Sequence, residues 1–229
     1  MLRTTTRLEF DTAQDLLDRL GGIPAYRVLL DPKPGTARVR DVIRHANGAN
    51  KRLVELVDGT LVEKAMGARE SFLGTLISRW MSNFVEEAGD TGMVLGVDGT
   101  LKIMPGLVRI PDVSYTSWDK LPGRKVPSKP VPSLLPDLAV EVVSKGNTRG
   151  EMKRKLAEYL EVGIPEIWMV FPKSRSVRVY RSATESVKYE SADTLVSTVL
   201  PGFSVSLAKL FEKLADEPAA KKPRKRKKP

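Results

Sequence analysis

The chain has 229 residues, no cysteine, one histidine and a formal net charge of +10. The lack of cysteine excludes disulfides, thiolate zinc sites and a cysteine nucleophile, and His45 alone cannot form a multi-histidine metal site. Any bound metal would therefore be held mainly by oxygen ligands, which suits Mg²⁺ or Mn²⁺. The length predicts one main domain with short extensions.

The positive charge is concentrated near the C-terminus. Seven lysines and arginines lie from Lys221 to Lys228, which leaves a net charge of about +3 for the rest of the chain. A basic run interrupted by proline is typical of a disordered tail, and the alternative is a phosphate tether that holds DNA nearby. No apolar segment approaches the roughly 20 residues of a membrane span, and the N-terminus lacks a signal-peptide pattern. We therefore expect a cytoplasmic protein with no membrane contact.

The N-terminal part of the chain predicts two short helices. Residues 11–20 form the first, because Thr12 and Asp15 can make a capping pair and Gly21 follows the last apolar position. Residues 37–46 could form the second. Two such helices could form a helix-turn-helix, but no recognition-helix pattern stands out.

The pattern changes from helices to strands after Arg52. The dipeptides Asp58-Gly59 and Asp98-Gly99 each separate two short apolar runs, which predicts two β-hairpins. The strands expected in these hairpins cover residues 53–57, 60–63, 93–97 and 101–104. Apolar residues recur at helical spacing between the two hairpins, which predicts a core-facing helix over residues 70–87.

The second half of the chain predicts a mixed sheet around a strand–helix–strand unit. Strands are expected at residues 107–115, 137–143, 166–170 and 176–180, with weaker runs near Val187 and Leu195. A long loop is expected at residues 119–136, and helices are expected at residues 148–162 and 203–214. Strand, helix and strand within some thirty residues form a βαβ-like unit. The fold class is therefore α/β.

Glu141 needs an explanation, because it lies inside the apolar run of residues 138–143. A carboxylate buried in a strand costs several kcal/mol unless it is paired, hydrogen-bonded or bound to metal. Alternation along the strand places Glu141 on the same face as Ala139 and Val143. Glu141 could bind a metal ion, or it could simply pair with a buried arginine or lysine.

Asp112 and Lys155 accompany Glu141 in the chain. Asp112 follows a proline, and alone it would be a structural residue at the start of a strand or turn. Helical periodicity places Lys155 and Lys153 on opposite margins of a buried arc, from which a lysine can aim its ammonium at a strand end, while Arg154 points to solvent. Two carboxylates and a lysine in this order suggest metal-assisted hydrolysis of a phosphodiester.

Four segments with compatible spacing, residues 55–63, 109–113, 136–144 and 155–168, resemble the family of putative restriction endonucleases. That family is a branch of the PD-(D/E)XK nuclease superfamily. The resemblance implies a restriction-endonuclease-like fold, in which a mixed β-sheet core is flanked by helices and preceded by β-hairpins. This domain would cover residues 50–214, between an N-terminal helical extension (1–49) and the basic, disordered tail (215–229).

The resemblance also implies a catalytic site. Asp112 and Glu141 would hold one or two Mg²⁺ or Mn²⁺ ions, and Lys155 would orient the attacking water or neutralise charge on the phosphate. Glu63 is a further candidate for a metal or water contact. The lysine that usually follows the strand glutamate by two positions is replaced by Val143, and in this branch Lys155 on the next helix takes its role.

Three functions remain open on these observations. The first is a metal-dependent endonuclease that hydrolyses DNA, with a homodimer as the simplest way to cut both strands. The second is a catalytically degenerate nucleic-acid-binding module, in which Val143 reflects a lost lysine. The third is a protein-interaction module whose basic tail contacts an acidic partner. No Gly-rich phosphate loop, nucleophile elbow or dinucleotide fingerprint is present, which argues against nucleotidases and kinases.

Overall fold

The computed structural model describes residues 10–49 and 51–215, so the basic run from Lys221 to Lys228 lies outside the described residues. The helices are α1 (Ala13–Arg19), α2 (Val39–Asn47), α3 (Ala68–Glu87), α4 (Arg149–Glu161) and α5 (Leu207–Phe211), with 3₁₀ turns η1 (Ala25–Arg27), η2 (Trp118–Lys120) and η3 (Pro122–Arg124). The strands are β1 (Val28–Leu29), β2 (Val54–Val57), β3 (Thr60–Glu63), β4 (Gly92–Leu95), β5 (Leu101–Met104), β6 (Leu107–Arg109), β7 (Val113–Ser117), β8 (Leu138–Val142), β9 (Glu166–Phe171), β10 (Ser176–Tyr180), β11 (Ser186–Tyr189), β12 (Thr194–Val196) and β13 (Ser204–Ser206).

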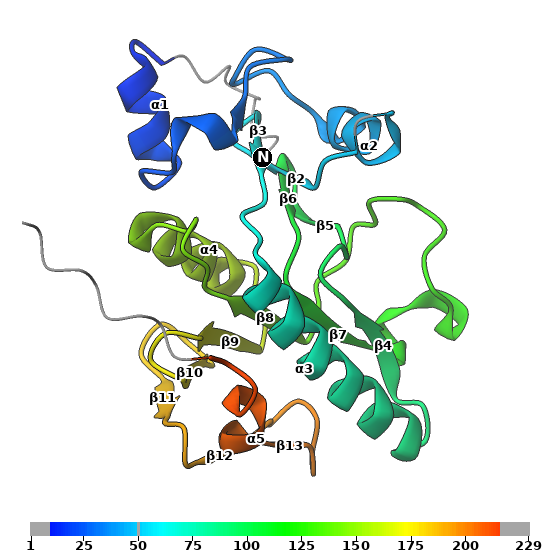
Figure 1. Ribbon diagram of the computed structural model, residues 1–229. Coiled ribbons are helices and arrows are strands. Elements are labelled where there is room, and N and C mark those ends of the chain that lie inside the picture. The colour runs from blue at the N-terminus through cyan, green and yellow to red at the C-terminus, as the bar shows by residue number, and fades with distance from the viewer. Residues whose placement is uncertain (1–9, 50, 216–229) are drawn as a thin grey trace, which may run out of the picture.

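Two main sheets form the described chain (Figure 1). The five-stranded sheet has the order β1-β3-β2-β6-β5, and the six-stranded sheet has the order β11-β10-β9-β8-β7-β4. Strands β8 and β9 are parallel and are joined by α4, whereas the other neighbours in the six-stranded sheet are antiparallel. The predicted mixed sheet and its βαβ unit are therefore confirmed.

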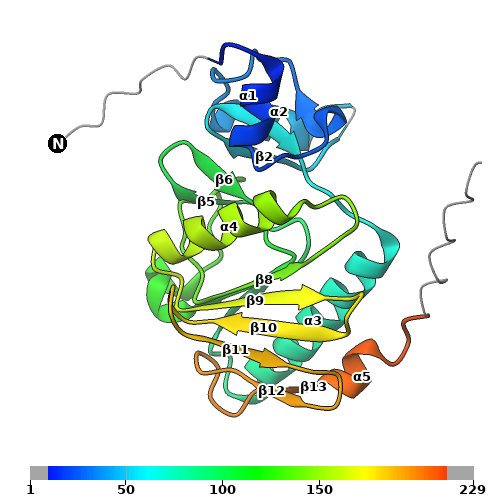
Figure 2. The same cartoon turned by 90° about the vertical axis from the view of Figure 1, so that its left-hand side faces the viewer.

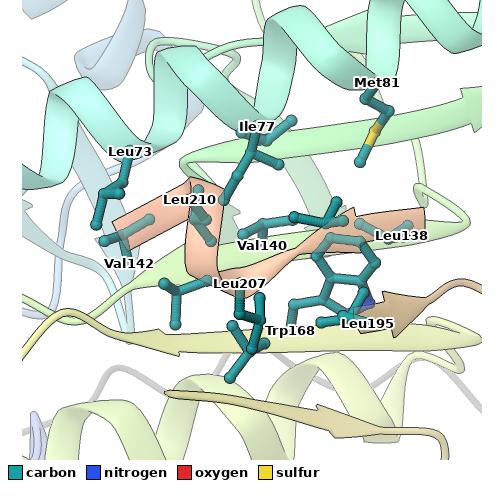
Figure 3. Packing of buried hydrophobic residues seen from close by; sticks show 14 of the residues in the cluster. Leu73, Ile77, Met81, Leu138, Val140, Val142, Trp168, Leu195, Leu207 and Leu210 are labelled. Atoms are coloured by element: carbon teal, nitrogen blue, oxygen red, sulfur yellow. The ribbon is translucent and has the colours of Figure 1, made fainter. Parts of the chain in front are cut away.

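Different helices pack on the two faces of the six-stranded sheet (Figure 2). Helix α4 lies on the face toward the five-stranded sheet, and α3 and α5 lie on the other face. Val140 and Val142 of β8 belong to the cluster that contains Ile77 of α3 (Figure 3). Ala139 belongs to the cluster that contains Tyr159 of α4. The predicted alternation along this strand is correct, and it places Glu141 beneath α4.

The prediction of one strand over residues 107–115 was wrong, because the structure has two strands there, β6 and β7. Strand β6 belongs to the five-stranded sheet and β7 to the six-stranded sheet. Pro111 lies between them and has no N–H to donate to a strand neighbour, so the ladder is interrupted there and the chain crosses from one sheet to the other. Asp112 consequently sits at the junction of the two sheets.

Only one of the two predicted hairpins forms. Asp58 and Gly59 have positive φ angles of 49° and 66°, and they join β2 to β3 as expected. The prediction of a hairpin at Asp98-Gly99 was wrong, because β4 and β5 belong to different sheets. A turn forms there, with the Gly99 N–H donating to the Gly96 carbonyl at 3.0 Å, but β4 pairs with β7 of the six-stranded sheet. Strand β5 pairs with β6 instead.

The N-terminal segment is part of the five-stranded sheet. The two predicted helices form as α1 and α2, and η1 and β1 separate them, so they do not make a helix-turn-helix. Strand β1 pairs with β3, with Val28 opposite Val62. Residues on both sides of the expected boundary near residue 50 therefore share one sheet.

The C-terminal helix is shorter than the sequence predicts. Residues 204–206 form β13, and α5 covers only Leu207–Phe211. Val205 alternates with two serines and pairs with Leu195 of β12, so the local apolar pattern has strand periodicity at this point. No helix in the described part of the chain is long and apolar enough to cross a membrane.

Candidate active site

Asp112 lies directly before β7, and Glu141 lies on the neighbouring strand β8. In the antiparallel pair of β7 and β8, Val113 lies opposite Val140, and the Asp112 N–H donates to the Val140 carbonyl at 2.9 Å. The Val142 N–H donates to Oδ2 of Asp112 at 2.6 Å, so the Asp112 carboxylate lies beside the end of β8 that carries Glu141. Both residues are buried, at 6% and 3% exposure. The sheet therefore brings together two of the three predicted catalytic residues.

Lys155 of α4 contacts Glu141 directly. Its Nζ lies 3.2 Å from Oε1 and 3.1 Å from Oε2 of Glu141. The prediction that Lys155 lies at the margin of the buried arc was wrong, because only 2% of this residue is exposed while Lys153 is exposed. The five-stranded sheet covers α4, and its carboxylate from Glu55 helps to neutralise the buried ammonium.

Glu55 of β2 is a site residue that sequence reasoning missed. Its Oε1 lies 2.9 Å from Nζ of Lys155, and the Ile110 N–H donates to the same oxygen at 3.1 Å. Burial alone would raise the pKa of Glu55, but Lys155 and Arg109 lower it to about 2. The available signal was an acidic residue in the apolar run of residues 53–57, which is the same signal that singled out Glu141.

Burial raises the pKa of Glu141, Lys155 partly offsets this effect, and the nearby carboxylates of Asp112 and Glu55 raise it further. Burial alone would lower the pKa of Lys155, but Glu141 and Glu55 together raise it. Tyr159 donates its O–H to Oε1 of Glu141 at 2.5 Å, and burial and Glu141 raise the pKa of this phenol. Lys155 therefore stays protonated and Tyr159 stays a hydrogen-bond donor at neutral pH.

Lys64 is a second missed residue. It follows β3, and its Nζ lies 2.9 Å from Oδ1 of Asp112 and donates to the Val97 carbonyl at 2.9 Å. The other carboxylate oxygen of Asp112 accepts the Val142 N–H at 2.6 Å. A single lysine after a strand gives no signal in the sequence, so only the packing of the two sheets reveals this pair.

Further ion pairs join α4 to the five-stranded sheet. Arg109 of β6 bonds to Glu55 at 2.7 Å and to Glu158 of α4 at 2.5 to 2.8 Å. Arg154 does not point to solvent, contrary to the prediction, because it pairs with Asp58 at 3.0 Å and with Glu158 at 2.7 Å. Arg109 contacts Glu55 of β2, and Arg154 contacts Asp58 in the turn between β2 and β3. Helical periodicity alone does not reveal that the five-stranded sheet covers this helix.

Glu63 is placed differently from the other candidate metal ligands. Its side chain is 41% exposed and pairs with Arg52 at 3.7 Å. The contacts given for the described residues do not join its carboxylate to Asp112 or Glu141. A role for Glu63 at a metal ion remains a prediction.

The donor chemistry of Asp112 and Glu141 fits a hard divalent cation. Mg²⁺ is commonly bound by one or two carboxylates, with water and substrate phosphate completing its shell. Residues 10–49 and 51–215 contain no group of three histidine, cysteine or acidic side chains that could hold a metal. The two carboxylates now contact Lys64 and Lys155, so a cation would have to compete with these ammonium groups.

Two comparisons with known proteins identify a family and a fold. The model of the Uma2 family, described as Putative restriction endonuclease, matches residues 44–208. A putative nuclease belonging to DUF820 from Anabaena variabilis ATCC 29413, known from a crystal structure, is similar over 69% of this chain and 89% of that chain, with a TM-score of 0.61 and 17% sequence identity. No curated protein sequence matches. The structural likeness confirms the predicted fold class.

Proposed function

Because the chain belongs to the Uma2 family, described as Putative restriction endonuclease, we propose that it is a metal-dependent endonuclease that hydrolyses phosphodiester bonds in DNA. The observation that supports this most directly is that the Asp112 carboxylate lies beside the end of β8 that carries Glu141, with Lys155 in contact with Glu141. Family and fold support a nuclease, and the metal ion and the DNA substrate are the further parts of the proposal.

In this proposal each site residue has a role. Asp112 and Glu141 hold Mg²⁺ or Mn²⁺, with Glu63 as a further candidate ligand. The ion, when bound, polarises the scissile phosphate and lowers the pKa of a coordinated water. Lys155 orients the attacking water or neutralises charge that develops on the phosphate, as a compact point charge can.

Two neighbours support these roles. Glu55 lies 2.9 Å from the Lys155 ammonium and would keep it in place if Glu141 held a cation. Tyr159 donates to Oε1 of Glu141 at 2.5 Å and so fixes the orientation of the carboxylate. Neither residue needs to touch the substrate, so both are positioning residues.

A second candidate is a catalytically degenerate nucleic-acid-binding or protein-interaction module with the same fold. The observation that favours it is the neutralisation of both carboxylates by Lys64 and Lys155, together with Val143 at the usual lysine position. In this alternative the ion pairs are permanent and stabilise the fold. The protein would then bind DNA with a strong dependence on salt and leave it uncut.

Cleavage of supercoiled plasmid with Mg²⁺ or Mn²⁺ separates the two candidates. The variants are Asp112→Asn, Glu141→Gln and Lys155→Met, and the matched controls are Asp119→Asn, Glu161→Gln and Lys153→Met, whose parent residues are exposed. The nuclease predicts metal-dependent nicking that falls by about 100-fold or more in each site variant but in no control. Thermal unfolding of every variant shows whether it is folded. An intact protein that binds no metal by calorimetry and cuts no DNA would identify the degenerate module.

The proposed partners can be tested with the same material. A dimer, which would place two active sites on one duplex, predicts a sedimentation coefficient that rises with protein concentration. Removal of Lys221 to Lys228 should lower DNA affinity and its salt dependence if this run is a phosphate tether. Unchanged DNA affinity after the removal would favour contact with an acidic protein partner.

A further inference from the structure

A cleft of about 1370 Å³ adjoins the candidate active site, and the proposed function does not yet explain it. Its walls come from η1, the connection of β3 to α3, the loop after β8 and the turn between β9 and β10. Lys64 joins the cleft to the site, because it lines the cleft and lies 2.9 Å from Asp112. The volume exceeds the roughly 300–1,000 Å³ of pockets that hold small molecules. It is large enough for several units of a polymer.

The charge of the lining favours a polyanion. Arg69, Lys145 and Lys173 reach the cleft from three separate segments, and Lys145 and Lys173 are exposed. The acidic lining residues are Glu63, which pairs with Arg52, and Glu70. An excess of cationic groups along a concave surface attracts the phosphates of a nucleic-acid backbone.

The depth of the site distinguishes between forms of nucleic acid. Asp112 is 6% exposed and Glu141 is 3% exposed, and the cleft reaches them through Lys64, which contacts Asp112. An intact duplex is a stiff rod that holds its phosphates on a convex surface. A single strand is flexible and can follow a charged groove. The buried position of the carboxylates therefore favours a single strand.

Tyr26 adds an aromatic surface at the same cleft. This residue is 79% exposed although it lines the cleft. The backbone beneath it is held by Arg27, which is 3% exposed and makes two bonds of 2.7 and 2.9 Å to Glu151. An exposed aromatic ring beside a basic groove is typical of proteins on which unpaired bases stack. Paired bases in a duplex do not offer their faces to such a ring.

From these observations we propose that the cleft binds a single strand of DNA and not an intact duplex. One base stacks on Tyr26, the backbone follows the side chains of Lys145 and Lys173, and a phosphodiester reaches Asp112 beside Lys64. Delivery of this phosphodiester for cleavage rests on the proposed nuclease function. Binding of the strand does not, because it needs neither metal nor hydrolysis.

The binding test uses the full chain in EDTA and one labelled DNA oligonucleotide, either single-stranded or annealed to its complement. Fluorescence anisotropy should show tighter binding of the single strand. Tyr26→Ala should weaken this binding by about 10-fold, a typical effect for loss of one stacked base, and leave duplex binding unchanged. Phe72→Ala is the matched control, because Phe72 is 43% exposed and does not line the cleft. Equal or tighter binding of the duplex, or equal effects of the two variants, would overturn the proposal.

A cleavage test in Mn²⁺ keeps this proposal separate from the nuclease assignment. Faster cutting of the single strand supports both. Cutting of the duplex at the same or a higher rate overturns the single-strand proposal and leaves the nuclease function standing. Tight, Tyr26-dependent binding of the single strand without cleavage supports the binding site and contradicts the nuclease function.

Discussion

Glu55 of the five-stranded sheet and Glu141 of the six-stranded sheet contact the same ammonium group, Nζ of Lys155, at 2.9 and 3.1 Å. Each of these three residues is at most 3% exposed. A cation shared between two buried carboxylates joins the sheets electrostatically and also places a positive charge at the candidate metal ligand. The same contact therefore links the stability of the fold to the arrangement of the site.

Lys155→Met should destabilise the protein by about 3–5 kcal/mol, because it leaves two buried carboxylates without their shared cation. Lys153→Met, two positions earlier on the same helix, removes an exposed lysine and should change the free energy of unfolding by less than about 0.5 kcal/mol. Urea denaturation of both variants measures these differences. A loss for Lys155→Met as small as that of the control would mean that the shared ammonium does not stabilise the fold.

Glu55 predicts a pH dependence of stability. Its pKa falls from 4.5 to about 2 on folding, so its ionised form contributes roughly 3 kcal/mol that is fully present above pH 4.5 and is lost as the pH falls toward 2. Glu55→Gln should therefore be much less stable than the parent at pH 7, and this difference should shrink at pH 3. Glu161→Gln, on the exposed end of α4, should show no such trend. The measurement is urea denaturation at both pH values, and a constant difference for Glu55→Gln would contradict the prediction.

Arg27 should hold the N-terminal segment onto α4. Its guanidinium bonds to both carboxylate oxygens of Glu151 at 2.7 and 2.9 Å and also to the Glu63 carbonyl at 2.8 Å. Arg27→Met leaves the buried Glu151 unpaired and should cost about 3–5 kcal/mol. Hydrogen exchange should show the largest loss of protection in β1 and its partner β3. Exposed Arg40 provides the control, and Arg40→Met should leave the exchange of both strands unchanged.

Gly59 should be sensitive to a methyl group for two separable reasons. Its φ is +66°, and a Cβ there would lie 2.7 Å from the backbone of Gly35. Gly106 has a φ of +78° but no atom within 4 Å of an added Cβ. Gly106→Ala should therefore lower the free energy of unfolding by about 1–2 kcal/mol, the cost of a side chain at positive φ. Gly59→Ala should lower it by more, because the added methyl group also meets the Gly35 backbone. Thermal and urea unfolding compare the two, and equal losses would show that the turn moves away from Gly35 without cost.

The sequence by itself determined the local elements and the chemistry available to the site. Helical spacing located α3, the Asp58-Gly59 turn located the β2–β3 hairpin, and strand alternation placed Glu141 on the same face as Ala139. These features depend on residues a few positions apart, so the periodicity of one segment is sufficient to predict them. The lack of cysteine and the single histidine restricted any metal site to oxygen ligands.

Only the tertiary structure decided which segments share a sheet and which charges meet. The chain changes sheets at Pro111 and again between β4 and β5, and neither change follows from the local apolar pattern. Glu55 and Lys155 are 100 positions apart in sequence, and Lys64 and Asp112 are 48 positions apart. These buried pairs form because the five-stranded sheet covers α4 and the start of β7. An ionised group buried there is stable only if an opposite charge lies beside it.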